Sequence, residues 1–324
     1  MKRDNETERD GPEAPAIALS IFMVCAALLL PGPAHAAFIM DASAGARNTD
    51  NVNNAATTKK GDTLSTLHLS FGGYTQLADY TGASLTVDLH KETSGYSGLN
   101  LVSSGLSLAL THKVGLGPAA PRLNLYGSAS NENYSDDYRD STSYKIGIFA
   151  SEWVHERVKV GLGYEFDKRI TASSYGITFG SGGSGGSGDS GNGYAPKHAS
   201  SYGTDYANIY DLQGNSGILD VELIITEKDL LFLSYRYRSG DVVSVDSRSL
   251  KALNVSSAWS ADNTFTGLVA YRLKAVSHIA TVEVSHELAR KWSLNLGYAF
   301  NMTAGDGGND YQTNRYNLAI AYSY

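Results

Sequence analysis

The chain has 324 residues, with 26 Lys and Arg against 33 Asp and Glu, which gives a formal net charge of −7 at pH 7. This acidic balance argues against a nucleic-acid binder, which needs a basic face to displace counterions. The single cysteine, Cys25, falls in an apolar N-terminal run. The rest of the chain therefore offers neither disulfides nor thiol chemistry.

The N-terminus has the pattern of an export signal. An uncharged run from Ala16 to Leu30 is followed by a Pro-Gly-Pro turn and then by Ala34-His35-Ala36. The run is short for a membrane helix, and the small-x-small triplet predicts cleavage after Ala36. The preceding segment mixes acidic with basic residues, so either the true start lies further along or the signal is atypical. We expect residues 1–36 to be a signal peptide and residues 37–324 to form the mature domain.

No later segment is apolar enough for a membrane helix, and the mean hydropathy is −0.22. A membrane β-barrel has such a value because only every second strand residue faces lipid and the loops are polar. Tyrosine is the commonest aromatic, with 21 residues. Its ring and hydroxyl suit the interface between lipid and water.

Period-two alternation predicts a run of strands about ten residues long. In chain order they lie near residues 38–48, 64–76, 83–92, 105–113, 122–132, 144–153, 158–167, 219–226, 231–238, 276–285, 292–301 and 314–324. The first is the weakest, because its outward positions are mostly alanine. With it the count reaches the even number expected of a bacterial barrel, so the predicted fold is an all-β, twelve-stranded antiparallel up-and-down barrel.

The connections alternate between short and long, as periplasmic turns and extracellular loops do. The short ones are predicted at residues 77–82, 114–120, 154–156, 227–228 and 289–291, and the long ones at 49–62, 93–103, 133–142, 168–216, 240–272 and 303–313. Loop 168–216 carries a Gly/Ser run followed by tyrosines. We expect a flexible tether there, with an inward-folding aromatic half as the alternative.

The last strand places aromatic and aliphatic residues on one face and small polar ones on the other, up to the terminal Tyr324. This ending resembles the C-terminal signature of bacterial outer-membrane barrels, whose aromatic last residue is recognised by the barrel-assembly machinery. The mature chain as a whole resembles uncharacterised proteobacterial outer-membrane barrel proteins in AGARNTDNV (44–52), YRYRSGDVVS (235–244) and KWSLNLGY (291–298). The resemblance implies a porin-like fold in the outer membrane of a Gram-negative bacterium, with lipid and the assembly machinery as partners. It supplies no catalytic residues.

The two faces of the strands predict two sets of residues. Aromatic residues of the lipid-interface girdle are predicted to be Trp292, Tyr298, Phe300, Tyr235, Tyr237, Tyr322 and Tyr324. Charged residues of the opposite parity are the candidates to line the lumen: Asp88, Glu92, Lys145, Lys159, Glu165, Asp167, Asp220, Glu222, Arg236, Arg238, Glu283 and Arg315. Around the turn at 227–228, antiparallel pairing predicts an ion pair between Asp220 and Arg236.

These charges allow two interpretations. They neutralise one another and stiffen the barrel, or they line a narrow polar channel. Acidic residues outnumber basic ones in the set, so the balance supports at most a weak cation preference. The first hypothesis is a channel for passive passage of small polar solutes. The alternative is a structural or interaction barrel with a closed lumen that serves surface polysaccharide or protein export.

The third hypothesis is an interfacial lipid hydrolase, which needs a lipid-facing His and Ser with an orienting Asn. His278 and His112 have outward parity, but the characteristic His-x-Ser-Asn-Gly segment is absent. We therefore expect no enzyme activity. No Cys or clustered His has transition-metal spacing, so we expect neither a metal nor a cofactor.

Overall fold

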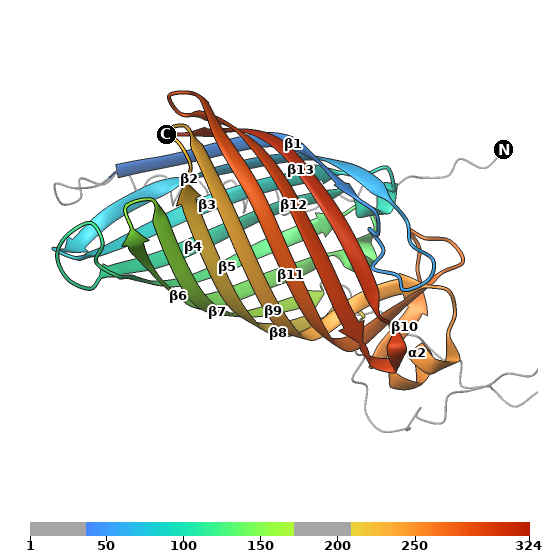
Figure 1. Cartoon of the computed structure of the whole chain (residues 1–324). Coiled ribbons are helices and arrows are strands. Elements are labelled where there is room, and N and C mark those ends of the chain that lie inside the picture. The colour runs from blue at the N-terminus through green and yellow to red at the C-terminus, as the bar shows by residue number, and fades with distance from the viewer. Residues whose placement is uncertain (1–36, 172–208) are drawn as a thin grey trace, which may run out of the picture.

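The computed structural model describes residues 37–171 and 209–324. The predicted signal peptide and most of the predicted loop 168–216 lie outside the described residues. Twelve antiparallel strands form one closed barrel (Figure 1). Within the described ranges, no helix is long and apolar enough to cross a membrane.

Every predicted strand is present, and most are longer than expected. The barrel strands are Ala37–Thr49 (β1), Asp62–Ala78 (β2), Thr81–Thr93 (β3), Leu101–Lys113 (β4), Arg122–Tyr134 (β5), Ser141–His155 (β6), Val158–Thr171 (β7), Leu212–Ile224 (β8), Asp229–Asp246 (β9), Val269–Ala289 (β11), Trp292–Gly305 (β12) and Tyr311–Ser323 (β13). A short strand β10 (Ala258–Ala261) and the helix α2 (Leu250–Val255) lie between β9 and β11. Short 3-10 turns cover Ser97–Leu99, Asp137–Arg139 and Asp306–Gly308.

Two pairings close the ring. The first strand pairs with the last, from Asp41 opposite Ser323 to Thr49 opposite Arg315, which confirms that the terminal strand completes the barrel. β9 pairs with β11 over their full length, so β10 stands outside the ring and pairs only with the first residues of β11.

The predicted sorting of connections also holds. Short turns join the strands at the end of the barrel where the C-terminus lies, and α2 and β10 lie at the opposite end (Figure 1). The two-residue turn at Arg290-Lys291 places Lys291 at a φ of 76°, a left-handed conformation that is uncommon outside glycine. The predicted loop 240–272 is partly wrong, because β9 continues to Asp246 and β11 already begins at Val269.

The outer face of the barrel is apolar. On β4 the outward Leu106, Leu108 and Leu110 are 43%, 58% and 39% exposed, while the intervening residues turn inward. An apolar belt of this extent is a lipid-facing surface in a closed barrel.

The residues predicted for the girdle lie on this outer face in two groups. The Trp292 ring is 5.1 Å from that of Tyr322 near the short turns, with Tyr324 beside them at the end of the chain. Tyr298, 5.2 Å from the Tyr316 ring, lies further along β12. Phe300 is the next outward residue of β12, and it shares its register with Ala280 and with Tyr235 of β9, where Tyr237 lies two residues beyond. The role of these aromatic residues at the interface between lipid and water stays a prediction.

Candidate functional site

The inner face of the barrel carries ion pairs that skip a strand. Arg236 Nη1 on β9 lies 2.6 Å from Glu165 Oε1 on β7, and Arg238 Nη2 lies 2.8 Å from Asp167 Oδ2, both across β8. Side chains converge over an intervening strand only on the concave side of a curved sheet. These four predicted lumen residues therefore share the inner face.

Small residues on β8 make room for these contacts. Gly214 and Ser216 occupy the inward positions that the two arginines cross, and a Cβ on Gly214 would lie 2.5 Å from Arg238 Nη2. The guanidinium groups can therefore lie along the wall instead of projecting across the lumen. The Ser216 side chain is buried beneath them.

The same arrangement is repeated two strands further round the ring. The Tyr126 hydroxyl on β5 donates to Glu165 Oε2 at 3.0 Å, across Gly147 of β6. A Cβ on Gly147 would overlap the Tyr126 ring. Glu165 thus receives two partners from opposite sides, which offsets the cost of its burial at 8% side-chain exposure.

Two further pairs follow the pattern. Arg169 on β7 reaches Glu132 on β5 at 3.4 Å, and Arg47 on β1 reaches Glu92 on β3 at 2.8 Å. Serines on the strand between support the first pair, since Ser143 Oγ donates to Glu132 at 2.8 Å. Lys159 and Glu222 instead pair between the neighbouring strands β7 and β8 at 3.1 Å.

The predicted ion pair between Asp220 and Arg236 is wrong. The register places Asp220 opposite Ser234, whose hydroxyl donates to it at 2.6 Å, and places Arg236 opposite Ile218. The long guanidinium side chain reaches past its neighbour to Glu165 on the next strand but one.

The remaining predicted lumen residues lie on the same face with other partners or none. Asp88 accepts from Ser107 Oγ at 2.8 Å and lies 3.8 Å from His68 Nε2. Lys145, Glu283 and Arg315 form no ion pair with any described residue. Within residues 37–171 and 209–324, no group of three or more His, Cys, Asp or Glu is arranged to hold a metal ion.

The charged wall stays in contact with water. The Arg236 side chain is 34% exposed and that of Lys159 is 31% exposed, although both are ion-paired. A recess of about 260 Å³ opens beside Arg236, and its charged lining consists of Lys145, Glu165, Asp167, Lys168, Arg169, Arg236 and Arg238. It is smaller than the roughly 300–1,000 Å³ of a typical small-molecule site.

The mouth of the barrel at the end with the long connections is crossed by the tip of the β10–β11 hairpin. Residues 262–265, which we call the crossing segment, belong to the β11 side of the ring but contact the β3–β4 connection, where the Phe265 ring lies 4.9 Å from that of Tyr96. Five strand positions separate β3 from β11 in one direction, and β4 follows as the sixth. In a ring of twelve, this segment therefore reaches the opposite wall.

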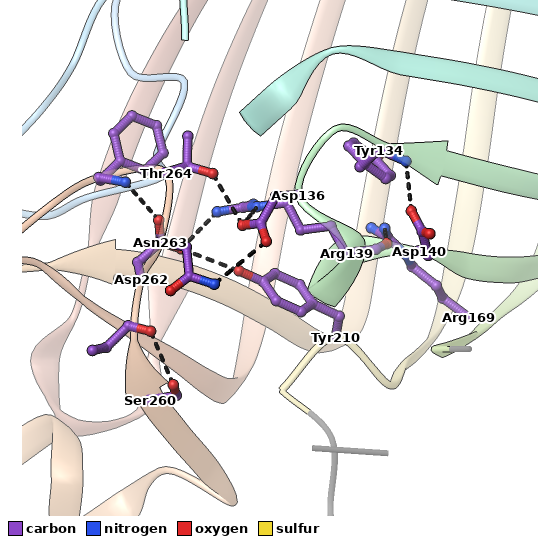
Figure 2. Close-up of polar contacts among 12 residues, drawn as sticks. Tyr134, Asp136, Arg139, Asp140, Arg169, Tyr210, Ser260, Asp262, Asn263 and Thr264 are labelled. Atoms are coloured by element: carbon purple, nitrogen blue, oxygen red, sulfur yellow. Dashed lines mark hydrogen bonds and ion pairs between the residues drawn. The ribbon is translucent and has the colours of Figure 1, made fainter. Parts of the chain in front are cut away.

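A buried polar network, drawn in Figure 2, holds the crossing segment. Asp262 accepts from Arg139 Nη2 at 2.6 Å, from the Tyr210 hydroxyl at 3.1 Å and from Phe265 N at 2.7 Å, and its side chain is fully buried. Arg139 also lies over the Tyr210 ring, 4.9 Å from its centroid. Burial raises the pKa of Tyr210, so its hydroxyl stays a donor. Thr264 Oγ1 donates to Asp136 at 3.1 Å.

A second contact fixes the end of β9 to the β1–β2 connection. Val245 N donates to the Asn53 carbonyl at 2.9 Å, and Asp246 accepts from Thr57 N at 2.8 Å and from Thr58 N at 3.0 Å. Burial raises the pKa of Asp246, but the hydrogen bonds from Thr57 and Thr58 outweigh it and lower the pKa to about 2. The carboxylate therefore stays charged at neutral pH.

The outward histidines take hydrogen-bond partners that differ from a hydrolase site. His278 Nδ1 lies 2.7 Å from the Tyr235 hydroxyl, and its ring lies 5.5 Å from that of Tyr237. His112 Nδ1 lies 2.9 Å from Thr81 Oγ1. Each of these outward histidines therefore has a hydroxyl partner.

Of three comparisons with known proteins, the one with solved structures finds similar folds. No protein-family model matches the chain, and no curated protein matches it. Among solved structures, an outer membrane channel from Pseudomonas putida F1 is 12% identical, covers 90% of this chain and 97% of its own, and has a TM-score of 0.54. Also similar is the NanC porin, which is 10% identical, covers 87% of this chain and 98% of its own, and has a TM-score of 0.43. The translocator domain of the autotransporter NalP from Neisseria meningitidis is 12% identical, covers 96% of this chain and 96% of its own, and has a TM-score of 0.40. At this identity the likeness to the Pseudomonas channel shows a shared fold: an outer-membrane type of closed antiparallel β-barrel.

Proposed function

We propose that the protein is a porin-like channel for passive passage of small polar solutes across the outer membrane. One observation carries the proposal: the inward charged side chains lie along the wall, paired over small residues, and those of Arg236, Arg47 and Lys159 keep 34%, 32% and 31% of their surface exposed. A closed structural core would bury such groups or fill the space with apolar side chains.

The chemistry of the wall favours broad passage over tight binding. Most charges are neutralised by a partner within 3.4 Å, so no long row of one sign runs along the described lumen. The recess beside Arg236 and Arg238 is small for a binding site. The outer-membrane channel with a comparable fold supports this assignment by analogy.

The location follows from the same proposal. The apolar outer face fits outer-membrane lipid, and the terminal Tyr324, 63% exposed, fits recognition by the barrel-assembly machinery. Cleavage of the leader near Ala36 would leave a mature chain that begins at the first residue of β1. Fractionation of outer and inner membranes, with N-terminal sequencing of the mature protein, tests each of these points.

A planar lipid bilayer tests the channel directly. The purified, folded protein should give discrete conductance steps, with a modest preference between potassium and chloride. Replacing Arg236 and Glu222 should then alter ion selectivity. If the lumen is closed, the same substitutions should change only thermal stability.

One observation favours the alternative of a structural or interaction barrel. The crossing segment and its buried network obstruct part of the extracellular mouth and offer a loop surface to a protein or polysaccharide partner. Silence in the bilayer at several salt concentrations, from protein with folded gel mobility, would support this alternative over the channel.

A further inference from the structure

The extracellular ends of β9 and β11 extend beyond the neighbouring strands β8 and β12. β8 pairs with β9 only as far as Gly214 opposite Gly240, and β12 pairs with β11 only from Ala275 opposite Gly305. Residues 241–274, which we call the flap, therefore have no neighbouring barrel strand on either side. Figure 1 shows this part of the chain, with α2 and β10, at one end of the barrel.

The base of the flap is a line of small residues. Gly240 and Ala275 are direct partners, so Gly214, Gly240, Ala275 and Gly305 occupy one register line across four consecutive strands. A Cβ on Gly240 would overlap the backbone of Gln213 and Gly214, so the strands approach closely there. Small side chains offer little resistance when packed elements bend, which suits a hinge.

The flap itself is a compact unit. Tyr271 and Leu273 pack against Ala252 of α2 on one face, with Trp259 against the same cluster. Val245, Ala270 and Phe265 pack together on the other face, where Val52, Tyr96, Leu99 and Ile209 of three other connections cover them. The flap is therefore one packed unit, and the packing on this second face has to separate when the flap moves.

The flap is fastened to its surroundings by the contact of Val245 and Asp246 with the β1–β2 connection, by the packing around Phe265, and, at the opposite wall, by one polar network. Asp262 is bonded to Arg139 and Tyr210, which lie on two other connections, and Thr264 is bonded to Asp136 (Figure 2). The Phe265 ring adds one aromatic contact with Tyr96. A buried charge pair of this kind holds firmly when complete and fails when one partner is lost, because the other charge is left buried without compensation.

We propose that the flap is a gate for the proposed channel, hinged on the line from Gly214 to Gly305 and latched by Asp262 on Arg139 and Tyr210. The inference rests on the proposed function, because it concerns access to the same lumen. When the latch is broken, the crossing segment leaves the far wall and passage increases. When the latch is fixed in place, passage through the channel stays low.

A disulfide can fix the latch. A Cβ on Gly98 would lie 3.1 Å from Thr264 Cβ, slightly less than the 3.5–4.5 Å usual in disulfides, so a small shift allows the bond. The double variant Gly98→Cys/Thr264→Cys is made in a Cys25→Ser background, which removes the only natural thiol. Its conductance should be low when oxidised and should rise on reduction.

Two release variants and one control complete the set. Asp262→Asn and Arg139→Gln should each raise the mean conductance. Ser260→Ala should not, because that hydroxyl donates only to the adjacent Ala261 carbonyl. Movement is measured separately through Thr264→Cys, whose labelling by a maleimide should be about tenfold faster with Asp262→Asn, since a lost charged hydrogen bond is worth at least that factor.

The outcomes separate the two proposals. Equal conductance in the oxidised, reduced and release variants, with unchanged labelling rates, would overturn the gate and leave the channel standing. If no variant conducts, even reduced or with the latch removed, the channel itself is wrong and the gate falls with it. Gel mobility of each heated and unheated variant confirms that only folded barrels are compared.

Discussion

The hydroxyl of Tyr126 donates to the Glu165 carboxylate over an intervening strand, and Gly147 is the residue that permits it. The contact belongs to a wall in which long polar side chains lie over glycine and serine. Its geometry gives a direct test of how closely the inner face is packed.

Gly147→Ala should displace the Tyr126 ring and destabilise the barrel. The new methyl group would overlap the ring, and overpacking of this kind costs about 1–3 kcal/mol. The measurement is the temperature at which gel mobility changes from folded to unfolded. Gly217→Ala is the matched control, since a Cβ there meets nothing within 4 Å. If both variants unfold like the parent protein, Tyr126 does not lie over Gly147.

Single neutralisations of the pair Arg236 and Glu165 should shift ion selectivity in opposite directions. Arg236→Gln removes a positive charge and favours cations, whereas Glu165→Gln favours anions. At about 8 Å in water one charge shifts the energies of a cation and an anion by about 0.5 kcal/mol each, in opposite directions, so the permeability ratio changes roughly fivefold. Reversal potentials in a salt gradient measure it. The double variant should return close to the parent value, and an additive shift in one direction would contradict the pairing.

Acid should weaken the contact between the β1–β2 connection and the flap through Asp246. Its pKa is lowered to about 2, so the carboxylate stabilises the fold above its ordinary pKa of about 3.9, and this contribution is lost as the pH falls toward 2. The full contribution is roughly 2 kcal/mol. Asp246→Asn should therefore unfold at a lower temperature than the parent at neutral pH, and the difference should shrink in acid. A difference independent of pH would exclude this role.

The fluorescence of Trp292 should respond to contact with lipid, and that of Trp153 should not. Trp292 is 48% exposed on the outer face, whereas Trp153 lies on the inner face with Lys159 Nζ 5.8 Å from its ring centroid. Variants that keep a single tryptophan should differ in quenching by lipids with brominated acyl chains, strongly for Trp292 and weakly for Trp153. Equal quenching would contradict the assignment of inner and outer faces.

The strands could be predicted because the outer face of each strand carries apolar residues at every second position. Leu106, Leu108 and Leu110 alternate with smaller or polar residues, and that pattern needs no knowledge of neighbouring strands. Closure by the last strand was predicted for the same reason. The order of short and long connections then fixed the topology.

The contacts inside the lumen could not be predicted in the same way. Arg236 finds Glu165 rather than Asp220 because curvature brings alternate strands together, and curvature is a property of the whole ring. Tyr126 was missed as a partner for Glu165. The available signal was the run of small residues, such as Gly147 and Gly214, at inward positions between long charged ones.

The flap was predicted as loop because its strands lack simple alternation. Val243, Val245 and Ala270 are apolar on one face, and Val242, Tyr271 and Leu273 are apolar on the other. With both faces covered by protein, the period-two signal disappears.

The register line at Gly240 and Ala275 also makes the barrel modular. These two residues face each other across β9 and β11 at the point where the outer neighbours stop, so everything between them could be exchanged for a short turn without removing a pairing of β8 with β9 or of β11 with β12. The same boundary would accept a foreign epitope or binding peptide, which makes this barrel a scaffold for display on the cell surface.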